Sequence, residues 1–152
     1  MIIGIDPGYE RCGFAVMGPK MQLVNFGVIK TTPKDFSLRL HEIGQDFEQL
    51  LKKYKPNVLS IEDLFFVQNV TTGLKVAEVR GMLIYQAVNF GCQIYEPKPV
   101  EVKSSFTGNG KADKNAMAKI AQMQFGIDPG TTLDDAVDAI ACACWADVRK
   151  GF

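Results

Sequence analysis

Four carboxylates stand at positions in the sequence where their side chains could take part in catalysis. Asp6 ends an apolar run at the N-terminus and is followed by the turn residues Pro7-Gly8, and Glu62 likewise ends a later apolar run. Asp135 and Asp138 are three residues apart, so they share one face of a predicted helix. Because small apolar residues follow on that face, the helix can pack closely on a sheet and bring both acids to the strand ends.

Such a cluster of acids predicts a metal site. Carboxylates that converge in an apolar setting cannot all stay ionised without a cation, because like charges raise one another's pKa. Oxygen ligands without nearby His or Cys favour Mg²⁺ or Mn²⁺ over zinc. Two such ions, about 4 Å apart, can activate water and stabilise the leaving oxygen in phosphodiester hydrolysis. The pattern therefore predicts catalytic and metal-binding roles for Asp6, Glu62, Asp135 and Asp138.

Each acid also has a simpler explanation. Asp6 could cap its own turn, and Glu62 could stand at an exposed strand end. Asp135 and Asp138, with Asp134 beside them, could merely favour the positive end of a helix dipole. These explanations account for the acids one pair at a time, whereas a metal site accounts for their joint pattern.

Lysines between residues 98 and 119 form a second pattern. This stretch has an excess of about three positive charges in a chain whose net charge is zero. A phosphate backbone would find its contacts here, with Lys103, Lys111 and Lys114 as candidates for DNA binding. The alternative is a solvated face. Gly108-Asn109-Gly110-Lys111 does not match a P-loop, because Ala112 stands where Ser or Thr is required.

Phe65 and Phe66 directly follow the strand that ends in Glu62. One of them, Phe65, is a candidate for stacking on unpaired bases beside the cleavage site. The alternative is burial under the loop.

The elements that must position these residues follow from the hydrophobic periodicity. Three strands within about thirty residues leave no room for crossover helices, so they should be antiparallel. A helix started by Asp35 or Ser37 and ended by Pro56 comes next, and Asp113 and Thr132 are candidates to cap two later helices. We expect strands near 2–5, 12–17, 23–31, 57–63 and 93–96, and helices near 36–54, 72–89, 100–105, 113–124 and 132–150.

This order predicts an α/β fold, in which a mixed five-stranded sheet (three antiparallel strands, then parallel strands) carries helices on both faces. We expect a single domain over residues 1–152, without linker or repeat. The segment 72–89 is apolar on more than one face, which is typical of a helix covered by both the core and a partner subunit.

Composition limits the class of protein. An apolar content of 47% and a charged content of 22% are ordinary for a globular domain, and no apolar run reaches the length of a membrane span. We expect no signal peptide and a cytoplasmic location. Cys142 and Cys144 do not have a usual zinc or redox spacing and the other two cysteines are scattered, which indicates buried apolar side chains.

Beyond these patterns, the chain resembles the RuvC-type Holliday junction resolvases along nearly its whole length. The motifs that carry the resemblance are Gly4-Ile5-Asp6-Pro7-Gly8, Ser60-Ile61-Glu62-Asp63-Leu64-Phe65, Ala77-Glu78-Val79-Arg80-Gly81, Lys103 with Gly110-Lys111-Ala112-Asp113-Lys114, and Asp135-Ala136-Val137-Asp138-Ala139. The fold that this resemblance implies is ribonuclease H-like, in agreement with the strand order above.

The resemblance also implies a function. It implies a homodimer that binds four-way junction DNA and makes paired symmetric nicks in DNA recombination and repair, leaving 5′-phosphate and 3′-hydroxyl ends. It implies Mg²⁺, with Mn²⁺ as a substitute, and a branch-migration motor complex as a partner. By matching motifs, Asp6, Glu62, Asp135 and Asp138 look like the metal-binding acids. Phe65 looks like the stacking aromatic, and Lys103 and Lys114 look like the lysines near the scissile phosphate or the DNA backbone.

The sequence is also compatible with three other functions. A related ribonuclease H-fold nuclease could act on RNA or on other branched DNA. An actin-like ATPase also begins with a strand ending in Asp-x-Gly, but that fold repeats the motif in a second lobe, for which 152 residues leave no room. An inactive DNA-binding domain is disfavoured by the intact acids.

Overall fold

The computed structural model describes residues 1–64 and 69–150, which form one five-stranded sheet in the order β3-β2-β1-β4-β5. Strand β1 is antiparallel to β2 and parallel to β4, β2 is antiparallel to β3, and β4 is parallel to β5. The predicted mixed sheet is therefore confirmed. The strands are β1 (Ile2–Asp6), β2 (Arg11–Met17), β3 (Leu23–Lys30), β4 (Val58–Ile61) and β5 (Gln93–Tyr95).

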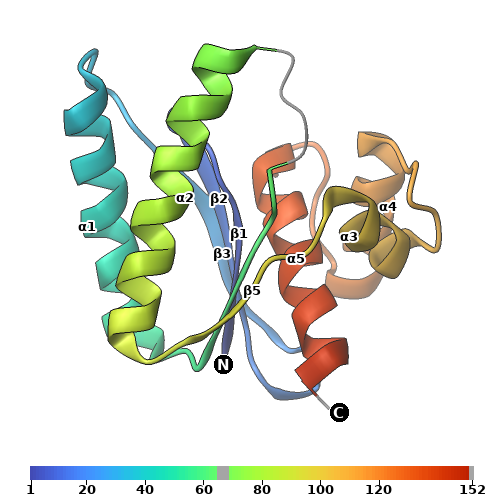
Figure 1. Ribbon diagram of the computed structural model, residues 1–152. Coiled ribbons are helices and arrows are strands. Elements are labelled where there is room, and N and C mark those ends of the chain that lie inside the picture. Colours follow the sequence, from blue (N-terminus) through green and yellow to red (C-terminus); the bar gives the residue numbers. More distant parts are fainter. Residues whose placement is uncertain (65–68, 151–152) are drawn as a thin grey trace.

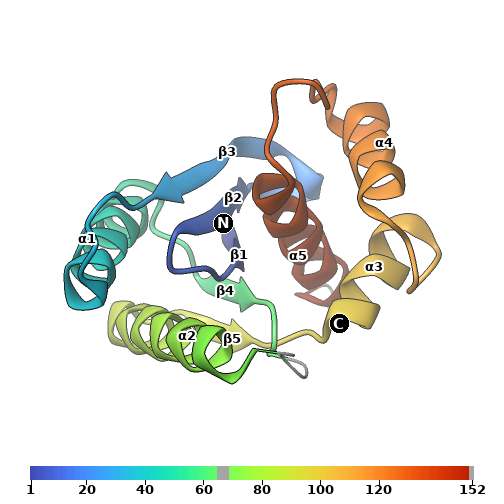
Figure 2. The same cartoon turned by 90° about the horizontal axis from the view of Figure 1, so that it is seen from above.

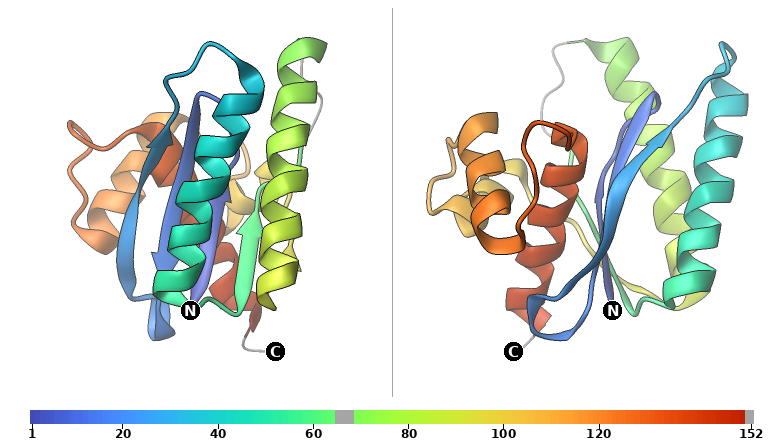
Figure 3. Two further views of the ribbon diagram at one scale, coloured as in Figure 1. Left: turned by 90° about the vertical axis from the view of Figure 1, so that its left-hand side faces the viewer. Right: turned by 180° about the vertical axis from the view of Figure 1, so that it is seen from behind.

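Helices cover both faces of this sheet, also as predicted. Helices α1 and α2 lie on one face, α5 lies on the other, and α3 and α4 pack outside α5, as Figures 1 and 2 show. The layers are seen in side view in Figure 3. The helices are α1 (Phe36–Tyr54), α2 (Val70–Phe90), α3 (Pro99–Thr107), α4 (Lys114–Phe125) and α5 (Asp134–Lys150), and a short 3₁₀ turn, η1 (Pro19–Met21), joins β2 to β3.

The sheet divides the core into two halves because side chains alternate along a strand. On β1, Ile3 and Ile5 pack in the half under α1 and α2. Ile2 packs in the other half, under α5. Gly4 and Asp6 have the same parity as Ile2, so β1 presents its carboxylate on the α5 side of the sheet.

Helix termini explain most of the element boundaries. The Asp35 carboxylate accepts a hydrogen bond from the N–H of Leu38 (3.2 Å), and Asp113 accepts one from Ala116 (2.8 Å), so both predicted caps are confirmed. Gly91 ends α2 with a φ of 93°, a conformation that glycine adopts without strain.

Helix α5 begins two residues later than expected. It starts at Asp134, so the residue directly before the helix is Leu133 and not the predicted cap Thr132. The cause is the preceding turn, in which the N–H groups of Thr131 and Thr132 donate to the Asp128 carbonyl (3.3 and 3.1 Å). Asp134 and Asp135 consequently lie in the first turn of α5.

Helix α2 is covered on one side only within this chain. Val79, Leu83 and Ala87 are fully buried against the sheet and α1, whereas Leu74 and Tyr85 are exposed. Among the described residues, none of the helices is both long enough and apolar enough to traverse a lipid bilayer.

Candidate active site

Small residues in the sheet let α5 approach it closely. Ala15, Gly4 and Ser60 are cross-strand neighbours on β2, β1 and β4. A β-carbon at Gly4 would lie 2.2 Å from the carbonyl oxygen of Ala139, a distance that no side chain tolerates. The Ser60 hydroxyl donates to the Cys142 carbonyl (2.8 Å), which ties the helix to β4. The main chain of α5 therefore rests directly on the centre of the sheet.

Gly13 allows an equally close approach of α5 at the end of the sheet where the acids lie. It pairs with Asp6 in the β1–β2 ladder, and a β-carbon on Gly13 would lie 1.9 Å from the Asp135 carbonyl oxygen. The first turn of α5 is thus held over the end of β1. Only glycine at position 13 leaves this space.

The structure brings the four predicted acids together at this place. Asp6 is the last residue of β1, and Glu62 directly follows β4, where its N–H donates to the Ile5 carbonyl (3.2 Å). Asp135 and Asp138 come from the first turns of α5. All four side chains are partly buried.

Their electrostatics show that the acids act on one another. Burial, followed by the negative charges of Asp138, Glu62 and Asp135, raises the pKa of Asp6 to about 8. Burial, followed by the charge of Asp138, raises the pKa of Glu62 to about 7. Burial also raises the pKa of Asp138. At neutral pH, carboxylates with such raised pKa values become fully ionised only when a positive charge is close to them.

The donor set fits a hard divalent cation, because it consists of partly buried carboxylate oxygens. One oxygen, Asp135 Oδ2, is inaccessible to solvent and accepts no hydrogen bond, although Arg11 Nε lies 3.3 Å away. As the side chains lie, no three His, Cys, Asp or Glu residues of the described chain are arranged to hold a metal ion. The oxygens would therefore have to draw together around a cation.

Two of the predicted lysines reach this cluster. Lys103 of α3 lowers the pKa values of Glu62 and Asp138, and Lys114 of α4 lowers those of Asp6 and Asp138. Lys114 also contacts Asp134 (2.9 Å). Lys111 lies exposed in the turn between α3 and α4, and its charge is not among those that shift the pKa values of the acids. Phe65 lies outside the described residues.

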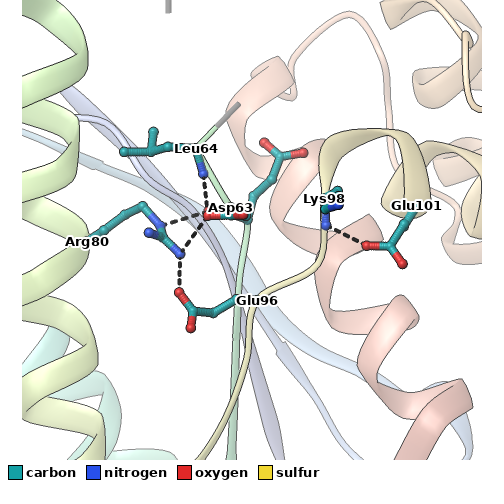
Figure 4. A network of polar contacts seen from close by, with 7 residues as sticks. Asp63, Leu64, Arg80, Glu96, Lys98 and Glu101 are labelled. Carbon is teal, nitrogen blue, oxygen red and sulfur yellow. Dashed lines mark hydrogen bonds and ion pairs between the residues drawn. The ribbon is translucent and has the colours of Figure 1, made fainter. Parts of the chain in front are cut away.

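Two arginines that sequence reasoning left without a role lie beside the acids. Figure 4 shows Arg80 of α2, whose Nη2 contacts Asp63 and Glu96. The Nε of Arg80 donates to the Glu62 carbonyl (3.0 Å). Its side chain is only 11% exposed. An arginine within an otherwise apolar helical segment usually has polar partners, and its position in that segment was the signal that the sequence offered. The second arginine is Arg11, whose Nε lies 3.3 Å from Asp135 Oδ2.

Comparison with known proteins places the chain in a family. Residues 2–145 match the family model described as crossover junction endodeoxyribonuclease RuvC. The protein of that name from Brachyspira hyodysenteriae is 42% identical over 145 residues, which cover 93% of this chain and 89% of the relative. The one from Thermosipho melanesiensis is 41% identical over 156 residues and 99% of each chain.

A solved structure agrees with these relatives. The chain is similar to "T. thermophilus RuvC in complex with Holliday junction substrate", with a TM-score of 0.85 and 26% identity over 97% of this chain and 95% of that one. The ribonuclease H-like fold predicted from the sequence is confirmed by this likeness and by the sheet order. The chain belongs to the RuvC family of crossover junction endodeoxyribonucleases.

Proposed function

We propose that this protein is an endonuclease that resolves four-way (Holliday) DNA junctions by paired symmetric nicks, in DNA recombination and repair. The observation that carries the proposal is the cluster of four carboxylates, gathered by α5 over the ends of β1 and β4 in a chain of the RuvC family. The RuvC structure similar to this chain was solved in complex with a Holliday junction substrate.

Family membership indicates a divalent metal cofactor. We infer that Mg²⁺ serves here, with Mn²⁺ as a substitute, and that Asp6, Glu62, Asp135 and Asp138 hold two ions. Bound ions of this kind activate a water molecule and stabilise the leaving oxygen of a phosphodiester. Asp6 is the acid whose pKa responds to the charges of all three others, so it would be central among the residues that hold the metal.

Positive side chains would position the DNA around these acids. Lys103 and Lys114 already interact with the carboxylates, so they are suited to neutralise a phosphate at the cleavage point. Lys111, in the exposed turn between their helices, is suited to a contact farther along the backbone. Phe65 would stack on a base at the junction.

Two symmetric nicks require two sites, and α2 offers a surface for a second copy of the chain. Four exposed apolar residues lie along one stripe of this helix, and the glycine in the same stripe has open space beside it. The stripe consists of Val70, Leu74, Gly81, Tyr85 and Val88. A homodimer would remove these side chains from water. A branch-migration motor as partner and a cytoplasmic location stay predictions.

The function is tested by incubating the protein with Mg²⁺ and a synthetic four-way junction, beside linear duplex DNA and an RNA–DNA hybrid. We expect paired nicks on the junction alone, with ligatable ends. Cleavage of the hybrid would favour a ribonuclease instead. Binding without any cleavage would favour an inactive DNA-binding domain.

A further inference from the structure

Arg11 lies beside Asp135 because of its place on the sheet. It is the first residue of β2, two residues before Gly13, so both residues face α5. Gly13 supports the main chain of Asp135, and the Arg11 guanidinium reaches the side chain of the same aspartate, with Nε 3.3 Å from Oδ2. The strand and the helix together fix this ion pair.

The two partners differ in their exposure. The side chain of Arg11 is 53% exposed, whereas that of Asp135 is 19% exposed. Asp135 Oδ2 is inaccessible to solvent and accepts no hydrogen bond, so the guanidinium compensates its charge without an aligned N–H. A buried acceptor left in this state is costly. The Arg11 side chain, in contrast, is already half exposed, so it can turn into solvent without an energetic cost for its own charge.

The neighbouring pair shows what is particular about this contact. Lys114 and Asp134 also form an ion pair, but their side chains are 74% and 52% exposed, so water can solvate both charges. The charge of Asp135 acts on Asp6, and Asp134 is not among the groups that shift the Asp6 pKa. Both aspartates act on Asp138, but only Asp135 also acts on Asp6, and only the Asp135 carboxylate is mostly buried.

We propose that Arg11 is a positioning residue that occupies Asp135 in the metal-free protein and is displaced by the incoming divalent cation. The inference rests on the proposed function, in which Asp135 is a metal ligand. A guanidinium and a dication that approach the same carboxylate oxygen repel each other, so a cation bound to Asp135 favours departure of the guanidinium. Arg11 thus holds Asp135 in place and raises the metal concentration at which the site fills.

The direct test measures Mn²⁺ binding without DNA, from the free Mn²⁺ signal in electron paramagnetic resonance. Removing an ion pair of which one partner is half exposed changes binding by about two- to five-fold, so Arg11→Gln should lower the Mn²⁺ dissociation constant by about that factor. Arg11→Lys keeps the charge and should stay within about two-fold of the wild type. These comparisons require no cleavage activity.

A matched control removes a positive charge far from the acids. Lys52→Gln breaks an exposed ion pair with Glu48 on α1 (2.7 Å) and should leave Mn²⁺ binding unchanged. Equal or weaker binding by Arg11→Gln would overturn the inference while leaving the proposed function intact. Absence of Mn²⁺ binding by the wild type would overturn both the metal site and the inference.

Displacement itself can be observed by nuclear magnetic resonance. The Nε–Hε signal of Arg11, assigned by its loss in Arg11→Gln, should shift along a saturable curve as Mg²⁺ is added. The Nε–Hε signal of Arg39 is the internal reference. Arg39 donates through Nη1 to the Thr31 hydroxyl (2.8 Å). An Arg11 signal that does not move at saturating Mg²⁺ would contradict displacement.

Discussion

The carbonyl oxygen of Asp135 lies over the α-carbon of Gly13, so that a β-carbon there would come within 1.9 Å of it. Gly13→Ala should therefore push the first turn of α5 away from β1. We expect a loss of about 1–3 kcal/mol in the free energy of unfolding, together with a fall in junction cleavage. Chemical denaturation and a cleavage assay measure the two effects.

The control for this change is Gly27→Ala on β3, whose new β-carbon would meet the ring of Phe14 at 3.1 Å. A ring can shift where a helix backbone cannot, so cleavage should be retained. Equal cleavage by Gly13→Ala and the wild type would show that the close approach of α5 is not needed for the site.

Asp6→Asn should abolish cleavage and spare binding. The change removes the carboxylate that interacts with all three other acids, and we expect cleavage to fall on the order of 100-fold or more. Junction affinity in a mobility-shift assay should be unchanged or higher, because a negative charge near the DNA is lost. A variant that cuts at the wild-type rate would refute the assignment of Asp6.

The metal-free protein should lose stability as the pH rises. The folded-state pKa values of Asp6 and Glu62 are about 8 and 7, against ordinary values of 3.8 and 4.5. Between these limits the folded state binds more protons than the unfolded state, so the free energy of unfolding decreases with increasing pH. The contribution is fully present below pH 4 and is lost as the pH passes through 7 and 8.

Denaturant unfolding in the presence of a chelator at pH 5 and pH 8 measures this loss. We expect a decrease of at least about 1.4 kcal/mol, the equivalent of one pKa unit. Asp6→Asn should show a smaller decrease, because it lacks the most strongly shifted group. A wild-type stability that stayed constant or rose over this range would contradict the raised pKa values of the buried acids.

Arg80→Gln should impair catalysis more than junction binding. Its guanidinium holds the Glu62 carbonyl and contacts Asp63 and Glu96, so its loss frees the segment that carries Glu62. Unfolding should become easier by about 1–3 kcal/mol. Cleavage under single-turnover conditions should slow, while the junction dissociation constant changes little.

Glu96→Gln provides the comparison for Arg80. It weakens one contact of the arginine but keeps the hydrogen bond to the Glu62 carbonyl. We therefore expect near-normal cleavage from this variant. If Glu96→Gln and Arg80→Gln were equally slow, the contact to Glu62 would not be the important one.

Tyr85→Glu should convert the proposed dimer to a monomer. It places a charge in the middle of the exposed apolar stripe on α2, where a second copy would bury it unpaired. Analytical ultracentrifugation measures the mass, and Leu38→Glu on α1, also an exposed position, is the control. An unchanged mass for Tyr85→Glu would place the interface elsewhere.

Local patterns in the sequence were enough to predict most of the fold. Short apolar runs between turn residues marked the strands, a period of three to four marked α1, and Asp35 and Asp113 marked helix starts, because these signals depend on neighbours in the chain. The acids at the ends of two strands, and the i,i+3 spacing of Asp135 and Asp138, were enough to predict the cluster.

The partners of Arg11 and Arg80 were decided only by the tertiary structure. Arg11 meets Asp135 across more than a hundred residues of chain, and Arg80 meets the Glu62 carbonyl because α2 returns beside the end of β4. The same holds for the distinction between Asp134, which contacts Lys114, and Asp135, which faces Asp6. Such contacts depend on strand order and on how closely α5 rests on Gly4 and Gly13, and hydrophobic periodicity does not encode either distance.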